Sequence, residues 1–185
     1  MQRLDQFELP ADFRGRSGTW CQLWWLVQAC LFATSPQFMY GWRRFLLRAF
    51  GAKIGQGVII RPSVRVTYPW KLTVGDHAWI GDHVELYTLG EITVGAHAVV
   101  SQRSYLCTGS HDSASLTFRI YAEPIVIEEG AWVATDVFIG PGVRVGRDAL
   151  IGARSSLFSS ADPAFVYVGS PARKIKPRKF ESQTT

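Results

Sequence analysis

An aliphatic residue recurs at every sixth position through most of the chain, and this period constrains the fold more than any other feature. The aligned positions, with a two-residue slip after Leu72 and after Ile92, are Ile54, Ile60, Val66, Leu72, Val74, Ile80, Leu86, Ile92, Val94, Val100, Leu106, Ile127, Val133, Ile139, Val145, Ile151 and Leu157. A helix repeats at 3.6 residues and a strand at 2, so neither element alone explains a period of six.

A period of six suits a short strand followed by a corner. Three such units close a triangular coil, and coils stack with their strands about 4.8 Å apart. The early coils repeat at twenty residues, from Ile54 to Val74 to Val94, and a later one at eighteen, from Ile127 to Val145. An antiparallel sandwich would alternate at period two instead. We therefore predict an all-β parallel β-helix whose aliphatic residues point inward.

The period is interrupted between Leu106 and Ile127. Residues 107–124 are rich in Ser, Thr and Gly, which predicts a loop extruded from the coil. Insertions in repeat proteins commonly lie on a binding face. His111 lies near the start of this loop, and an imidazole can take up a proton near neutral pH. His111 is therefore a candidate general base; the alternative is a solvated loop residue. Cys107 could form an acyl-enzyme with it, although a packing role is favoured.

A chain of 185 residues with 47% hydrophobic and 19% charged residues is typical of one folded domain. The net charge of +5 is local, because the chain without its C-terminal basic cluster has equal numbers of basic and acidic residues. That cluster is Arg173, Lys174, Lys176, Arg178 and Lys179. Such a cluster suits a small anion, whereas a nucleic-acid surface would spread its charge further.

The first 53 residues do not repeat, and two helices separated by TSPQ are expected there. An open coil end exposes unpaired strands, so a helical cap over residues 1–53 is predicted. A helix with Arg43, Arg44 and Arg48 could instead lie on a membrane. The apolar stretch 21–33 covers only about 20 Å, short of the ~30 Å hydrocarbon core. The β-helix is expected over 54–162 and a basic tail over 163–185.

The three cysteines, Cys21, Cys30 and Cys107, are odd in number and widely spaced, which argues against a disulfide framework. With no signal peptide recognised at the N-terminus, we expect a cytoplasmic protein, with the inner face of the membrane as a further location.

Several motifs resemble those of a known family. IGDHVE, VGAHAV, IGPGVR and IGARSS resemble the hexapeptide repeats of left-handed parallel β-helix acyltransferases, over about residues 51–178. RAFGAKIG, YLCTGSHD and VGSPARKIKPR most resemble exopolysaccharide O-acetyltransferases of the colanic acid type, relatives of the maltose and galactoside acetyltransferases. The left hand of the coil rests on this resemblance alone.

The resemblance implies a homotrimer that moves acetyl from acetyl-CoA to a sugar hydroxyl, with His111 as general base and the site between subunits. The maltose and galactoside enzymes carry an acceptor-site asparagine in the coil before the loop, and LYTLGE has none here. Tyr87 or Glu91 is expected to contact the acceptor instead, and Asp112 to orient the loop.

The donor site is implied by two further segments. AWVATD and GARSS resemble the segments along which the pantetheine arm lies, which assigns Trp132, Ala134, Thr135 and Ala153 to coenzyme A. Packing is the alternative for Trp132. Phosphates need cations, and the cluster supplies Arg173, Lys174, Lys176 and Arg178; the alternative is a solvated tail.

Two other functions use this fold. A non-enzymatic β-helix scaffold would bind no coenzyme A. A γ-class carbonic anhydrase would bind zinc through histidines five residues apart in one coil, and His77, His83 and His97 do not have that spacing. They are expected at exposed corners, and no metal is expected.

Overall fold

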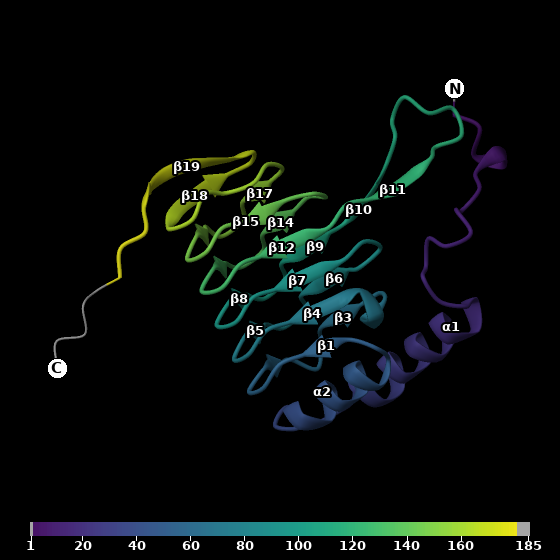
Figure 1. The fold of residues 1–185 in the computed structure, drawn as a ribbon, viewed down its shortest axis with the longest axis horizontal. Coiled ribbons are helices and arrows are strands. Elements are labelled where there is room, and N and C mark those ends of the chain that lie inside the picture. Colours follow the sequence, from purple (N-terminus) through teal and green to yellow (C-terminus); the bar gives the residue numbers. More distant parts are fainter. Residues whose placement is uncertain (1, 181–185) are drawn as a thin grey trace.

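The computed structural model describes residues 2–180, and part of the expected basic tail, 181–185, lies outside them. Figure 1 shows a stack of coils, with two helices across its N-terminal end and one hairpin projecting from its side. Five complete coils and the beginning of a sixth are present. The predicted parallel β-helix with a helical cap is confirmed.

Three parallel sheets form the faces of the coil. Sheet A is β1 (Lys53–Ile54), β4 (Leu72–Val74), β7 (Ile92–Val94), β12 (Ile125–Ile127) and β15 (Arg144–Val145). Sheet B is β2 (Ile59–Ile60), β5 (Trp79–Ile80), β8 (Val99–Val100), β13 (Trp132–Val133), β16 (Leu150–Ile151), β18 (Phe165–Gly169) and the antiparallel β19 (Ala172–Pro177). Sheet C is β3 (Arg65–Val66), β6 (Glu85–Tyr87), β9 (Tyr105–Cys107), β14 (Phe138–Ile139) and β17 (Ser156–Leu157).

The strand register matches the sequence alignment. In sheet A, Ile54 pairs with Val74, Val74 with Val94, and Val94 with Ile127. Each of these side chains is buried, as are the aliphatic residues at the aligned six-residue positions of sheets B and C. Stacking brings backbones close at the corners. A Cβ added to Gly75 would lie 2.5 Å from Ala96 N, so only glycine fits there.

The three corners form edges along the stack, which we call A–B, B–C and C–A after the sheets they join. His77 and His97 lie on the A–B edge and His83 on the B–C edge, all exposed and with φ between 57° and 58°. The rings of His77 and His97 stack at 5.2 Å. These histidines are corner residues, as expected.

The extruded segment leaves the coil at the C–A edge. It forms an antiparallel hairpin of β10 (Gly109–His111) and β11 (Ile120–Ala122), in which His111 pairs with Ile120. The hairpin lies tight against the edge, because a Cβ on Gly109 would approach Leu89 Cδ1 to 2.6 Å. At its base the buried hydroxyl of Thr108 donates to Tyr87 O and accepts from Gly90 N. The base of the hairpin is therefore fixed to the preceding coil.

The cap consists of α1 (Gly18–Val27), which continues into a turn of π-helix, η2 (Gln28–Phe32), and α2 (Tyr40–Ala49). Short 3-10 turns lie at η1 (Leu4–Gln6) and η3 (Pro69–Lys71). Ser17 caps α1 by accepting from Trp20 N. Trp24 lies buried over the first coil and donates to Val66 O at 2.7 Å.

Three arginines of α2 bind carbonyls of the first coil. Arg43 donates to Ile60 O at 2.6 Å, Arg44 to Val58 O at 2.7 Å, and Arg48 to Ile54 O at 2.6 Å. These carbonyls lie at the open end of the stack, where no preceding coil donates backbone N–H groups to them. The basic residues of α2 therefore tie the cap to the β-helix.

Candidate active site

His111 is held on the hairpin by one neighbouring residue. Its ring stacks on Phe118 at 3.8 Å, and its Nδ1 lies 2.7 Å from Phe118 O. A carbonyl oxygen only accepts, so Nδ1 carries the proton of the neutral imidazole. Nε2 is then the acceptor nitrogen of the ring. Phe118 has a φ of 53°, and its strained backbone turns the carbonyl toward the histidine.

An open hollow of about 360 Å³ surrounds this imidazole on the hairpin. It is lined by His111, Asp112, Ser113, Arg119, Tyr121 and Glu123. The carboxylate of Asp112 accepts from Ala114 N at 3.0 Å and pairs with Arg119 at 3.6 Å. Asp112 therefore shapes the hairpin tip. The Glu123 carboxylate, on the same hollow, lies against Gly142 of the next coil; the sequence reasoning did not identify it.

An N-terminal arm, residues 2–17, runs from the cap to the hairpin (Figure 1). Arg3 N donates to Leu116 O at the hairpin tip, and the Phe7 ring lies 6.0 Å from the His111 ring. The sequence reasoning missed this arm, since neither a period nor a motif indicates a contact between residues so far apart. The arm forms a wall beside the imidazole.

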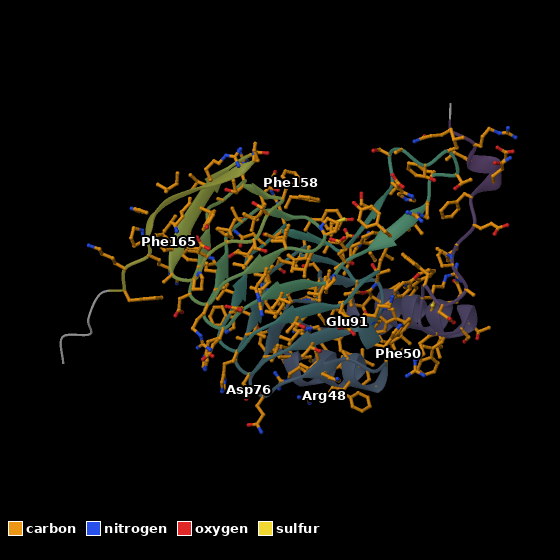
Figure 2. The ribbon with its side chains drawn as sticks, turned by 45° about the horizontal axis from the view of Figure 1, so that its top comes forward. Arg48, Phe50, Asp76, Glu91, Phe158 and Phe165 are labelled. Atoms are coloured by element: carbon orange, nitrogen blue, oxygen red, sulfur yellow. The ribbon has the colours of Figure 1, made fainter. Side chains whose placement is uncertain are left out.

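The other residues expected to contact the acceptor lie at the C–A edge. Tyr87 is half-buried at the end of β6, and burial raises its pKa above the ordinary value. Glu91 is exposed before β7, and Figure 2 shows it at the side of the stack opposite Asp76 of the A–B edge. Lys71 Nζ donates to Phe13 O of the arm at 2.6 Å and to Leu89 O. Burial lowers the pKa of Lys71, while nearby Glu91 acts in the opposite sense.

The residues expected to contact the donor lie on another edge. Ala134, Thr135 and Ala153 are on the B–C edge, where Thr135 Oγ1 donates to Gln102 O at 3.0 Å. Ala134 is buried and Ala153 exposed. An open hollow of about 420 Å³ follows this edge, with Thr135 in its lining. One protomer therefore places His111 and the expected pantetheine segments on different edges of the prism.

Trp132 lies outside this hollow, half-exposed on the face of sheet B, where its indole donates to Ser101 Oγ at 2.9 Å. A groove of about 880 Å³ runs from it to residues 176–180, with Lys176 and Arg178 in its lining. Arg173 and Lys174 lie on β19 of the C-terminal hairpin, where a basic tail was expected. The structure thus brings together Trp132, Lys176 and Arg178.

Cys107 lies at the end of β9, half-buried, and its Sγ donates to Gly109 O at 3.2 Å. This contact directs the thiol toward the base of the hairpin. All three cysteines are free of disulfides.

Comparison with known proteins decides the family. No protein-family model matches the chain. A protein of Escherichia coli (strain K12) that carries the name colanic acid biosynthesis acetyltransferase WcaF is 61% identical over 178 residues, covering 96% of this chain and 98% of its own. The chain belongs to this family of acetyltransferases.

More distant relatives share the fold. Galactoside O-acetyltransferase of E. coli (strain K12) is 26% identical over 137 residues, 72% of this chain and 68% of its own. A hexapeptide-repeat acetyltransferase of Vibrio cholerae O1 biovar eltor, solved with acetyl coenzyme A, superposes with a TM-score of 0.81 at 23% identity, covering 90% of this chain and 92% of that one. The resemblance noted in the sequence is therefore confirmed. No helix among residues 2–180 is long and apolar enough to span a membrane.

Proposed function

We propose that this acetyltransferase moves acetyl from acetyl-CoA to a sugar hydroxyl in the synthesis of a colanic-acid-type exopolysaccharide. The names of its relatives supply the reaction class and pathway, and a solved neighbour binds acetyl-CoA. The observation that carries the mechanism is the hydrogen bond from His111 Nδ1 to Phe118 O, because it leaves Nε2 free to accept a proton.

In the proposed step, Nε2 of His111 takes the proton of the sugar hydroxyl while its oxygen attacks the thioester carbonyl. The C–S bond then breaks, and the departing coenzyme A thiolate receives the proton from the imidazolium. No acyl-enzyme is needed. The inward turn of Cys107 toward Gly109 O supports direct transfer. Tyr87, Glu91, Asp112 and the newly placed Glu123 are the proposed acceptor contacts.

We propose that the donor lies along the B–C edge, with its pantetheine arm beside Ala134, Thr135 and Ala153 and with Trp132 near its nucleotide end. Phosphates would bind cations of the C-terminal hairpin. Lys176 lines one groove with Trp132, which supports this assignment.

The proposed assembly is a homotrimer. A three-fold axis facing sheet C would bring the C–A edge of each copy, with His111, against the B–C edge of the next, completing the site. The outer face of sheet C suits such an interface, because it carries a ladder of aromatic rings 5.6 to 5.9 Å apart. These rings belong to Tyr87, Tyr105, Phe138 and Phe158.

We place the reaction in the cytoplasm, since free cysteines suit a reducing compartment. The test is release of coenzyme A from acetyl-CoA with a panel of nucleotide-linked and lipid-linked sugars. His111→Ala should lower kcat by ~10²–10⁴, as for loss of a general base, with acetyl-CoA binding retained. An unchanged kcat would remove His111 from the mechanism. A wild-type protein that binds no coenzyme A would favour a scaffold.

A further inference from the structure

The cap has an apolar surface that faces away from the coil. No charged residue occurs between Arg16 and Arg43, a stretch that includes all of α1 and η2. Trp24 and Phe32 bury one side of this helix against the first coil. Leu23 and Leu26, separated by three residues and therefore on one face, are 44% and 60% exposed. A helix that is apolar on both its faces is unusual at a protein surface in water.

The connector and α2 extend this surface. Phe38 and Phe45 are 79% and 58% exposed. Phe45 lies two residues from both Arg43 and Leu47, which are buried against the coil, so helical periodicity places it on the opposite side of α2. We define the outer cap face as the large apolar residues of this region that are more than 40% exposed, which are Leu23, Leu26, Leu31, Phe38 and Phe45.

The charge around this face has one sign. Residues 13–75 contain nine basic residues and no acidic one. The basic residues are Arg14, Arg16, Arg43, Arg44, Arg48, Lys53, Arg61, Arg65 and Lys71. Within residues 2–180, Arg61 alone of these pairs with a carboxylate, that of Asp82 at 2.8 Å. The arginines of α2 donate to carbonyls, which do not neutralise their charge. The cap end therefore carries a positive field around an apolar face.

We propose that the outer cap face binds an anionic membrane surface. Apolar side chains enter the boundary between headgroups and acyl chains, and the surrounding cations attract anionic lipids. The helix formed by α1 and η2 is too short to span the bilayer: fifteen residues measure about 22 Å against a hydrocarbon core of ~30 Å. It therefore lies in the plane of the interface.

The β-helix axis then stands away from the membrane, with the cap beneath the coils. The hairpin with His111 projects from the side of the stack and is joined to the cap by the N-terminal arm (Figure 1). In the proposed trimer, rotation about an axis along the stack places all three caps at one end. Three weak contacts on one particle bind more tightly than one.

The experiment is sedimentation of the full-length protein with vesicles of phosphatidylglycerol and phosphatidylcholine, and with vesicles of phosphatidylcholine alone. We expect binding to the anionic vesicles that weakens with added salt. Leu23→Asn/Leu26→Asn should lower the partition coefficient about tenfold or more, because two apolar side chains no longer enter the interface.

Ile175→Asn is the matched control, since Ile175 on β19 is 56% exposed and lies at the other end of the coil stack. It should bind vesicles like the wild type. Coenzyme A release by each variant separates this inference from the proposed reaction, which uses none of these residues. Absence of wild-type binding to anionic vesicles, or equal loss in both variants, would overturn the proposal. Self-association in free solution that Leu23→Asn/Leu26→Asn abolishes, without vesicle binding, would assign the face to a second copy of the chain instead.

Discussion

The four basic residues of the C-terminal hairpin differ in whether their charged groups already have partners within the protein. Lys174 Nζ lies 2.9 Å from Asp162 Oδ2 and 3.4 Å from the centre of the Phe165 ring. Arg178 donates to the carbonyls of Gly130 and Asp148 at 3.1 Å. Within residues 2–180, Arg173 and Lys176 have no such side-chain partner. Four cations that look equivalent in the sequence therefore separate into two that support the fold and two that remain free for phosphate.

We expect Arg173→Gln/Lys176→Gln to raise the Kd for acetyl-CoA about tenfold or more, because charge-assisted bonds to phosphate are lost. Lys174→Gln/Arg178→Gln removes the same charge and is the control; it should lower the melting temperature and affect Kd less. Titration calorimetry with coenzyme A, at low and high salt, measures the Kd of both double variants. Equal changes in Kd would mean that net charge alone attracts the donor, and no change in either would leave the hairpin without a role in binding.

At the scale of elements, the coil could be predicted and the contacts between non-repeating segments could not. Each aligned aliphatic position from Ile54 to Leu157 points inward because the same residue type meets the same corner geometry in every coil. The interruption of that period also located His111. The partners of the imidazole could not be predicted, since Phe7 comes from a segment without a period and Phe118 acts through its carbonyl. That the proposed donor and acceptor residues lie on separate edges likewise could be seen only in the three-dimensional stack.

The cap depends on the buried guanidinium of Arg43. It donates to Ile60 O, Ser35 Oγ, Pro36 O and Gln37 O, at 2.6 to 2.9 Å. Arg43→Ala should lower the free energy of unfolding by about 3 kcal/mol or more, because several carbonyls lose their donor. Arg43→Lys should recover part of this, since one ammonium cannot reproduce the fork. Urea denaturation measures the effect, with exposed Arg48→Ala as a milder control; equal losses at both positions would contradict it.

Tyr105 of the aromatic ladder of sheet C makes the free energy of unfolding depend on pH in the alkaline range. Burial, and then the neighbouring Cys107 thiol, raise the pKa of Tyr105 well above its ordinary value of 10.0. A raised pKa means that the folded state holds the phenolic proton more tightly than the unfolded state. The stability from this difference is complete below pH 10 and is lost as pH rises toward the folded-state pKa. The wild type should therefore lose stability relative to Tyr105→Phe above pH 10 in denaturant titrations; parallel curves would contradict this.

At the scale of the whole molecule, a single prism keeps the two parts of the proposed site on different edges. His111 leaves the C–A edge, whereas Thr135 and Ala153 lie on the B–C edge, with the face of sheet C between them. Trimerisation about sheet C would place each histidine beside the donor edge of its neighbour. The proposed site is thus shared between two subunits. A subunit that lacks a working histidine can still supply its donor edge to a neighbour, and the reverse also holds.

This sharing predicts complementation between two inactive variants. His111→Ala lacks the base but keeps its donor edge, and Ala153→Trp blocks the exposed donor edge but keeps its histidine. Each homotrimer should be inactive. Random co-assembly from equal amounts should give about a quarter of the wild-type rate, because a site works only where an intact histidine meets an intact donor edge, each with even odds. Mixing folded homotrimers without unfolding them is the control and should recover nothing until subunits exchange. A co-assembled trimer that stays inactive would place the whole site within one protomer and remove the reason for assembly.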